Sequence, residues 1–296
     1  MLRVNPDIFT TVLNGIEQSR QQSNQLLQEV SSGRRVNAYS DDPAASATMV
    51  FNRAESSLND QFSRNISDLK SVLQTGDSAM SSTVSALTRA LTLGIQGANG
   101  TLSDTDRQAL AAEVSGIQQQ MLSIANSSVS GNYIFSGTNV STPAFVADLT
   151  SSSGVRYQGN TGVNSVELQA GQNTAINIPG SQIFTSASGN VFQALNDLQT
   201  ALSSNGDVPS AVSSVRTAMN EVSRQRSFYG QVINQMDAAG NSLAQDKVRL
   251  QSQENDLTGA DLAKVATDLS QTQITQNALM AAAGKVSQYT LFDFLK

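Results

Sequence analysis

Few residues in this chain could do chemistry, and none belongs to a complete catalytic set. Cysteine and histidine are both absent. Their absence excludes cysteine nucleophiles, thiolate and imidazole metal sites, and the most common general base. Asp41 and Asp42 are adjacent and could in principle act as a pair of acids. Ser67 and Lys70 have the Ser-x-x-Lys spacing of penicillin-interacting enzymes.

Each of these patterns has a structural explanation. Asp42 directly precedes Pro43, and an aspartate N-cap followed by proline is a common start of a helix. Asp41 is then either a solvated neighbour or a partner for Arg34 or Arg35. The Ser-x-x-Lys pattern lacks the Lys-Thr-Gly and Ser-Asp-Asn sequences that accompany it in enzymes. We therefore expect no catalytic residues, no cofactor and no metal site.

The composition favours long, thin helices over a thick globular core. Of the 296 residues, 14% are charged and 5% are aromatic, and there is no tryptophan. The net charge of −6 argues against a nucleic-acid or anionic-membrane partner. No run of apolar residues is long enough to predict a membrane span. The first residues lack the apolar core and cleavage site of a secretory signal peptide.

Hydrophobic periodicity predicts long helices in the N-terminal half. The first helix covers about residues 7–31 and has a narrow apolar stripe. Four residues of this stripe are Leu13, Ile16, Leu27 and Val30. Gly33 can end this helix in a left-handed conformation. A second helix from Pro43 to about residue 97 has an apolar face that repeats about every 3.6 residues, and a third covers about 104–128.

The C-terminal half mirrors this layout. Helical patterns cover about residues 191–203 and 209–257, and a capping-box sequence at 258–261 predicts the start of a last helix. The seam of that last helix contains Leu262, Val265, Leu269, Leu279 and Val286. Between residues 131 and 189 the pattern changes to alternation interrupted by glycines, which predicts short antiparallel strands.

These elements predict a mainly α fold with three parts. Residues 1–42 plus 258–296 form paired terminal coiled-coil arms. A long antiparallel helical trunk contains residues 43–130 plus 190–257. A small antiparallel β insert covers residues 131–189.

The thin apolar stripes of the arms have a functional implication. One monomer cannot satisfy them fully, so we expect the arms to become ordered when neighbouring subunits cover them. The expected assembly interface contains the arm residues named above together with Arg34, Arg35, Asp41 and Asp42 from the connector between the first two helices.

Two stretches resemble a known family. Residues 31–36, Ser-Ser-Gly-Arg-Arg-Val, and residues 40–45, Ser-Asp-Asp-Pro-Ala-Ala, resemble the N-terminal signature of the bacterial flagellin superfamily. The Asp-Asp-Pro form is similar to the hook-filament junction proteins of that superfamily, because flagellins usually have Asp-Asp-Ala-Ala-Gly there. Residues 131–137, Gly-Asn-Tyr-Ile-Phe-Ser-Gly, resemble the strand that opens the family's variable region.

The resemblance implies a structural subunit of the bacterial flagellum, outside the cell and exported without a cleaved signal peptide. Copies of the chain would form a ring that joins hook to filament and on which flagellin polymerises. The implied partners are other copies, the other hook-filament junction protein on the hook side, and flagellin on the filament side. An export chaperone would hold the C-terminal arm before assembly. The arms would form an inner tube, and the β insert would project outward.

Alternatives remain open at this point. A flagellin is the nearest one, although Pro43 and the ending at residues 289–296 depart from the usual flagellin pattern. A secreted type III needle-tip or translocator-like binding protein would share the helical ends but would not explain residues 31–45. An enzyme hidden in the β insert would need clustered acids, and Asp148 and Glu167 form no cluster in the sequence.

Overall fold

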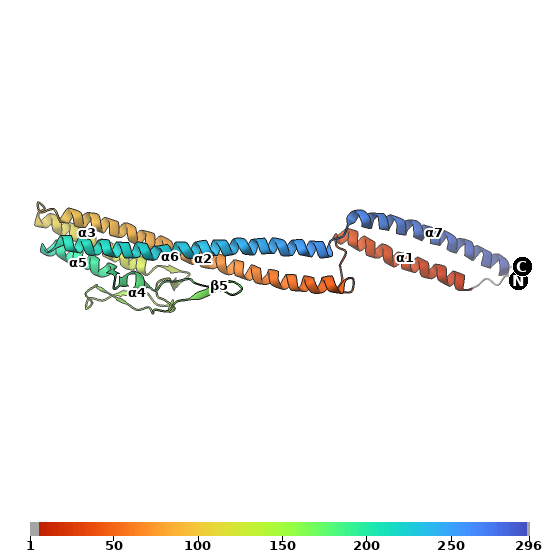
Figure 1. The fold of residues 1–296 in the computed structure, drawn as a ribbon, viewed down its shortest axis with the longest axis horizontal. Helices are drawn as coiled ribbons and strands as arrows, with labels where there is room; N and C mark the ends of the chain where they lie inside the picture. The colour runs from red at the N-terminus through yellow and green to blue at the C-terminus, as the bar shows by residue number, and fades with distance from the viewer. Residues whose placement is uncertain (1–5, 295–296) are drawn as a thin grey trace. The chain divides into compact units, whose positions relative to one another are not determined.

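The computed structural model describes residues 6–294, with side chains from residue 10 to residue 285. The described chain is mainly helical and contains only short antiparallel strand pairs, which confirms the predicted fold class (Figure 1). It divides into two units, residues 6–58 with 245–294 and Asn59–Ala244. The boundaries between these two units fall inside long helices. They therefore do not test the predicted division into arms and trunk at residues 42 and 258, which remains a proposal.

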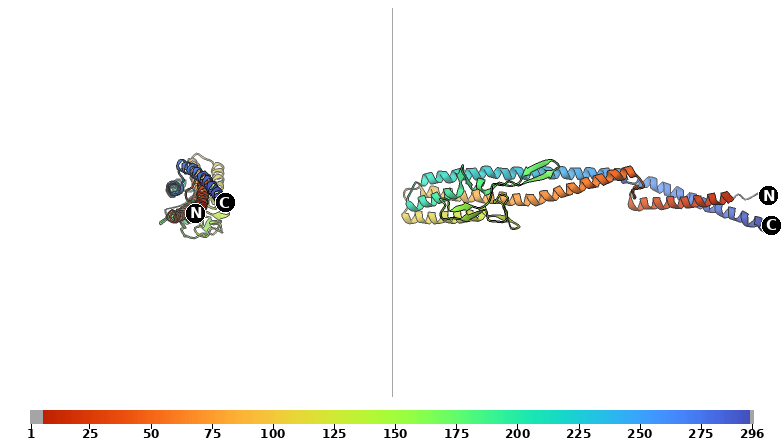
Figure 2. Two further views of the ribbon diagram at one scale, coloured as in Figure 1. Left: turned by 90° about the vertical axis from the view of Figure 1, so that its right-hand side faces the viewer. Right: turned by 90° about the horizontal axis from the view of Figure 1, so that it is seen from below.

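The first unit contains two antiparallel terminal helices that lie side by side. These are α1 (Pro6–Ser32) and α7 (Leu262–Phe294), and two further views show the same pairing (Figure 2). The unit also contains the first turns of α2 (Pro43–Gly97) and the last turns of α6 (Val208–Thr258). All four helices begin and end within a few residues of the predicted positions.

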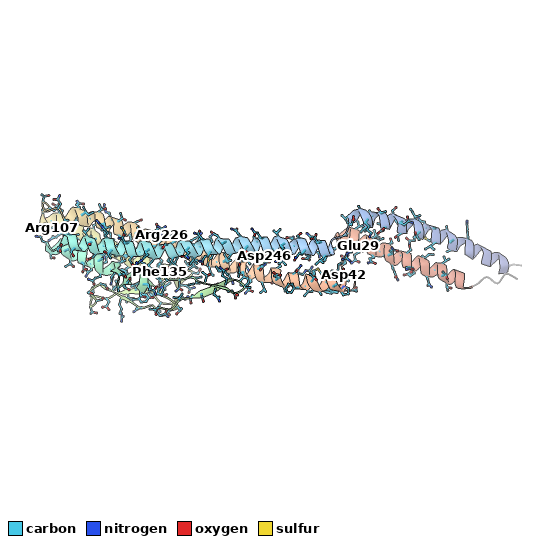
Figure 3. All side chains as sticks on the ribbon, in the orientation of Figure 1. Glu29, Asp42, Arg107, Phe135, Arg226 and Asp246 are labelled. Carbon is cyan, nitrogen blue, oxygen red and sulfur yellow. The ribbon has the colours of Figure 1, made fainter. Side chains whose placement is uncertain are left out.

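The start of α2 follows the predicted capping chemistry. Asp42 lies at the N-terminal end of this helix (Figure 3). The backbone N–H of Ala45 donates a hydrogen bond to Asp42 Oδ1 at 3.0 Å, and Pro43 occupies the first helical position. An oxygen acceptor at this place satisfies a backbone donor that has no partner inside the helix.

The second unit is built from the rest of α2 and α6 together with α3 (Asp104–Ala125) and α5 (Val191–Ser204). Its core is a continuous layer of aliphatic side chains from these four helices. Fully buried examples are Leu73, Met80, Leu87, Val114, Met121, Leu195, Val215, Val222 and Met236. Beside this core Arg226 binds Asp77 through two hydrogen bonds of 2.7 and 3.1 Å.

The segment between α3 and α5 forms four antiparallel pairs of short strands and one short helix. The pairs are β1 (Ser128–Val129) with β2 (Asn132–Tyr133), β3 (Phe145–Ala147) with β4 (Val155–Tyr157), β5 (Ser165–Gln169) with β6 (Gln172–Ala175), and β7 (Thr185–Ser186) with β8 (Gly189–Asn190). The short helix is α4 (Gly180–Ile183). The alternation of apolar residues in the sequence continues through Ile176 and Ile178 and predicts a strand there, but this prediction is wrong, because β6 ends at Ala175.

An aromatic cluster fixes this segment to the helices. The Phe145 ring lies 5.6 Å from the Phe184 ring and 5.3 Å from the Phe192 ring, measured between centroids, and Phe135 meets Phe184 edge to face at 5.2 Å. All four rings are buried. Such pairs add to the stabilisation from burial alone, so the cluster anchors short strands that would be unstable in isolation.

A close contact between α2 and α6 depends on a glycine. A Cβ atom at Gly76 would lie 2.6 Å from Cε1 of Tyr229, whose side chain is fully buried. Gly76 therefore costs helix propensity but allows the tyrosine ring to lie directly on α2.

We predict opposite effects for alanine at two helical glycines. Gly230→Ala should stabilise the protein by about 0.5–1 kcal/mol, because alanine is the better helix former and nothing lies near the new Cβ. Gly76→Ala should destabilise it by about 1–3 kcal/mol, because the Tyr229 ring must move within a packed core. Urea unfolding followed by circular dichroism measures both changes. Equal effects of the two substitutions would contradict the packing account.

Candidate assembly interface

The two breaks in the helices of the first unit are joined by a backbone bridge. The N–H of Arg35 donates to the carbonyl oxygen of Thr258 at 2.7 Å, and the N–H of Ala260 donates to that of Gly33 at 3.0 Å. We call residues 33–35 and 258–260 the connector bridge. It joins the α1–α2 connector to the α6–α7 connector, which lie far apart in the sequence.

Gly33 lets the chain turn into the bridge. Its φ angle is +67°, and its N–H donates to the carbonyl oxygen of Glu29 at 2.8 Å, as the left-handed end of a helix requires. The predicted role of Gly33 is therefore confirmed.

One arginine side chain reinforces the bridge from the α1–α2 connector. Arg35 Nη2 donates to Asp42 Oδ2 at 2.9 Å and to the backbone oxygen of Leu257 at 3.0 Å. It thereby links the last residue before α2 to the end of α6, where a cation is favoured by the helix dipole. Both charged side chains are partly exposed, so this contact positions the connector more than it adds stability.

Glu254 forms ion pairs with two other arginines of this region. Its Oε1 lies 2.9 Å from Arg53 Nη2 and 3.7 Å from Arg34 Nη2. Arg34 and Arg35 therefore contact different acidic residues, one on α6 and one at the start of α2.

Asp41 shapes the α1–α2 connector through backbone contacts. Its Oδ2 accepts hydrogen bonds from the N–H groups of Ala38 at 2.7 Å and Asn37 at 2.9 Å. These bonds hold the pKa of Asp41 below its ordinary value, because they favour the charged carboxylate. Of the two roles expected for Asp41, the arginine partner is wrong: Asp42 takes that role. The pKa of Asp42 is lowered first by the N–H of Ala45 and then by Arg35.

The second connector differs from the predicted capping box. Thr258 is buried and its hydroxyl donates to the carbonyl oxygen of Glu254 at 2.7 Å, so it extends the end of α6. Asp261 caps α7 instead, because its Oδ1 accepts from the N–H groups of Ala263 and Lys264, both at 3.1 Å. From the sequence, either Thr258 or Asp261 could cap α7. The connector bridge holds Thr258 at the end of α6, and this leaves Asp261 as the cap.

The α1–α7 seam is narrow and partly polar. Its buried residues are Ser19, Leu26, Val265 and Thr272. Ser19 Oγ donates to the backbone oxygen of Thr272 at 3.4 Å. Small residues allow the two helices to approach each other, and a Cβ at Gly15 would lie 3.5 Å from Leu279.

The predicted stripe of α1 does not coincide with this seam. Leu13, Leu27 and Val30 are 46%, 49% and 44% exposed, whereas the buried Leu26 was not predicted. The apolar residues of α1 form two adjacent strips, and a single partner helix covers only one of them. The sequence signal that could have indicated the buried strip is a series at steps of four and three residues, whose members are all buried or half-buried: Val12, Ile16, Ser19, Ser23 and Leu26.

The predicted residues of α7 are distributed between the seam and the surface. Val265 is buried, Leu269 and Leu279 are half-buried with Ile16 of α1, and Leu262 is 54% exposed. The side chain of Val286 lies outside the described residues. Two further apolar residues of α7 are exposed and were not predicted. Ile274 is 60% exposed and Met280 is 49% exposed.

Two kinds of site are not found among the described residues, metal sites and membrane spans. Within residues 10–285 no group of three or more acidic side chains is arranged to hold a metal ion. Among the helices as far as they are described, none is both long and apolar enough to cross a membrane.

Two family models match this chain. The bacterial flagellin N-terminal helical region matches residues 9–140, and the bacterial flagellin C-terminal helical region matches residues 212–295. Together they cover more than half of the chain. The chain belongs to the bacterial flagellin family. This membership makes it a structural protein of the flagellum.

Curated relatives from two branches of the flagellin family align over nearly the whole chain. Flagellar hook-associated protein 3 of Escherichia coli is 26% identical over 96% of both chains. The flagellar filament 30.7 kDa core protein of Treponema maltophilum is 29% identical over 96% of this chain and 95% of its own. The hook-associated relative confirms the resemblance to the junction branch that the sequence motifs indicated.

Solved structures show the same fold. A flagellar hook-associated protein from Vibrio parahaemolyticus matches with a TM-score of 0.68 and 24% identity, over 74% of this flagellin-family chain and all of that one. The flagellar junction protein FlgL from Legionella pneumophila matches with a TM-score of 0.62 and 15% identity. The match covers 72% of this chain and all of the Legionella chain.

Arg35→Gln should loosen the connector bridge without unfolding the helices. The variant loses the charged contacts to Asp42 and to the end of α6, so the amides of residue 35 and Ala260 should exchange hydrogen about two- to fivefold faster. Arg249→Gln is the matched control, because Arg249 makes its exposed ion pairs with Asp246 and Glu55 instead. Hydrogen exchange by mass spectrometry or NMR measures the difference. Equal exchange in both variants would rule out the role of Arg35.

The connector should also respond to acid. A carboxylate with a lowered pKa stabilises the folded connector above the ordinary aspartate pKa of 3.8, and this contribution is lost as the pH falls through the lowered value. NMR shifts of the Asn37 and Ala38 amides should therefore titrate with a midpoint below pH 3.8. In Asp41→Asn these shifts should no longer titrate, whereas the Ala45 amide should still follow Asp42. A midpoint at or above 3.8 would contradict the assignment.

Proposed function

We propose that this flagellin-family protein is the subunit of the junction that joins hook to filament. Copies of the chain would form a ring, and flagellin would polymerise on that ring. The observation that carries this proposal is that both helices of the α1–α7 pair expose large apolar side chains, which we call the exposed strip: Leu13, Leu27 and Val30 on α1, and Leu262 and Met280 on α7. The hook-associated relative that aligns over almost the full length supports the junction role over the filament role.

The strip has the geometry of an unfinished interface. Leu13 and Leu27 are fourteen residues apart, which is about four helical turns, so they lie on nearly the same face of α1. Leu262 and Met280 are similarly separated by about five turns on α7. Large apolar side chains that recur on one face of a surface helix indicate a contact with another protein. Neighbouring copies of this chain would supply that contact.

The partners follow from this role. On the hook side the ring would contact the other hook-filament junction protein, and on the filament side it would contact flagellin. The terminal arms, residues 1–42 plus 258–296, would form the inner tube, and the trunk would surround them. The insert, residues 131–189, would lie outside. The subunit would be exported without a cleaved signal peptide, with its C-terminal arm held by a chaperone.

A filament subunit is the second candidate. The Treponema filament protein supports it, because that relative also aligns over nearly the whole chain. The Asp42-Pro43 sequence at the start of α2 favours the junction branch instead. Membership of the flagellin family argues against the needle-tip or translocator-like alternative.

Deleting the gene distinguishes the two flagellar roles. If the chain is the junction subunit, hooks should be built and intact flagellin should appear unpolymerised in the culture medium. If the chain is the filament subunit, hooks should remain but no separate filament protein should be found. Normal filaments and swimming in the deletion strain would overturn both roles.

Complementation of the same strain tests the exposed strip. Leu27→Asp should leave the monomer folded, because Leu27 is half exposed, but should prevent filament formation by placing a charge in the subunit contact. Gln25→Asp is the matched control, because it adds the same charge to an exposed position of α1 on another face. Circular dichroism checks folding, and electron microscopy counts filaments. Normal filament numbers with Leu27→Asp would show that the strip is not an interface.

A further inference from the structure

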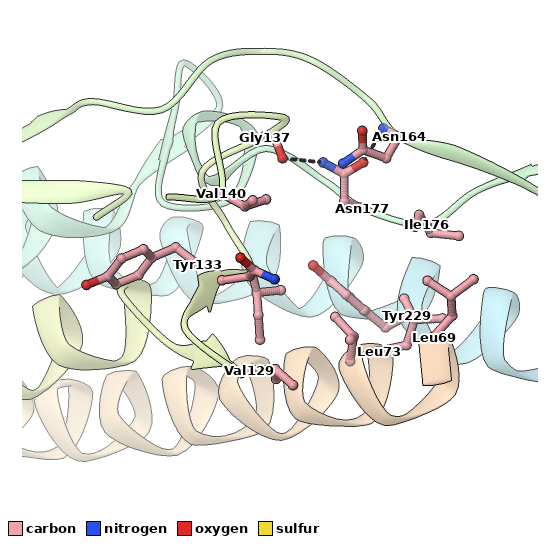
Figure 4. A pocket seen from close by; sticks show the side chains of 13 residues that line it. Leu69, Leu73, Val129, Tyr133, Gly137, Val140, Asn164, Ile176, Asn177 and Tyr229 are labelled. Carbon is pink, nitrogen blue, oxygen red and sulfur yellow. Dashed lines mark hydrogen bonds between the residues drawn. The ribbon is translucent and has the colours of Figure 1, made fainter. Parts of the chain in front are cut away.

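We call the segment between α3 and α5, residues 126–190, the β segment. A pocket of about 250 Å³ lies in the second unit, where the β segment meets α2 and α6 (Figure 4). Its walls come from elements far apart in the sequence. Its lining includes Leu69, Leu73, Val129, Val140, Ile176 and Tyr229. Several of these side chains are only half-buried, so the pocket reaches the surface.

Tyr229 supplies a hydroxyl with an unused donor at the inner wall. Its side chain is fully buried, and its hydroxyl finds no acceptor for its own hydrogen within the described chain, although the backbone of Ile178 interacts with its oxygen. Figure 4 shows this hydroxyl directed into the pocket between Val140 and Asn177. A buried donor that has lost its water and gained no acceptor is unfavourable, so such groups in folded proteins usually have an explanation.

The ring cannot turn away to find another partner. It lies against Gly76 of α2, where a Cβ would come within 2.6 Å, and it meets the Phe228 ring edge to face at 5.7 Å. Burial raises the pKa of the Tyr229 phenol, and a backbone hydrogen bond from Ile178 to its oxygen offsets only part of this rise. The hydroxyl is therefore protonated and can donate a hydrogen bond.

The other buried polar side chain of the pocket is already satisfied. Asn177 Nδ2 donates to the carbonyl oxygens of Gly137 at 3.3 Å and Gly162 at 3.2 Å, and its Oδ1 accepts from the N–H of Asn164 at 2.6 Å. Of these two buried polar side chains, Tyr229 is thus the one whose donor is unused.

The chemistry of the lining limits what the pocket can hold. No charged residue is present among the described residues that line it, which disfavours ions. The polar residues Asn132, Tyr133, Asn164 and Asn177 also line the pocket, which is open to water, so an occupant must displace that water. Apolar cavities of about 150 Å³ are known to bind benzene-sized molecules. The larger space here suits a single ring with a short substituent.

We propose that this pocket binds a small uncharged molecule with an apolar, ring-sized body and one hydrogen-bond acceptor, which receives the hydroxyl of Tyr229. The proposal goes beyond the structural role, because nothing in subunit assembly requires a ligand there. The occupant contacts α2, α6 and the β segment together. It therefore strengthens the attachment of the β segment to the helices and raises the melting temperature.

Two probes of similar shape test this proposal on the full chain. Acetophenone carries a carbonyl acceptor, and ethylbenzene does not. In methyl-labelled NMR titrations, both should cause saturable shifts of the Val140 and Ile176 methyl groups. Tyr229→Phe should weaken acetophenone binding about two- to tenfold, as expected for one hydrogen bond, and leave ethylbenzene binding nearly unchanged. Equal effects on the two probes would overturn the role of the hydroxyl.

Matched valine substitutions test the location. Val140→Phe should fill the pocket and abolish binding of both probes. Val163→Phe adds the same ring at an exposed position of the same segment, outside the lining, and should leave binding unchanged. The absence of saturable shifts in the unmodified chain, or equal binding by the two variants, would overturn the proposal.

Discussion

The connector bridge is the contact on which the first unit depends. Two backbone hydrogen bonds join residues 33–35 to residues 258–260. They close a very long loop of chain, and the entropy of that closure grows only slowly with loop length. Because each connector leads directly into a terminal helix, the bridge also brings α1 and α7 together in antiparallel register. Arg35 and Asp41 then fix the shape of the first connector with side-chain contacts.

The terminal pair that follows the bridge is poorly buried for its length. Its seam contains Ser19 and Thr272 beside only a few apolar side chains, while Leu13, Leu27 and Ile274 stay exposed. Two helices can cover only one strip of each other. A protein that functions as an isolated monomer would have little use for such apolar surface, whereas a subunit of a polymer needs it for its neighbours. The small buried area between these two helices therefore agrees with the assembly role proposed for them.

The second unit is stabilised in a different way from the first. Its helices share a broad aliphatic core, and an aromatic cluster attaches strands that are too short to be stable by themselves. The attachment is incomplete beside Tyr229, where the need to place a large ring against Gly76 leaves a pocket and a hydroxyl whose donor is unused. The pocket therefore lies where the helical core meets the strand-containing segment.

The sequence alone determined the helices and the family, because both depend on local signals. Asp42 with Pro43 favours the start of a helix and Gly33 favours the end of one through local chemistry, and apolar periodicity is visible without tertiary context. The tertiary structure decided which apolar strip of α1 is buried, since Leu26 and Leu27 are neighbours in sequence and only the position of α7 separates their environments. It also decided that Asp42, rather than Asp41, pairs with Arg35, and that Asp261 caps α7. The pocket beside Tyr229 likewise arises from walls distant in sequence, and no local pattern encodes the space between them.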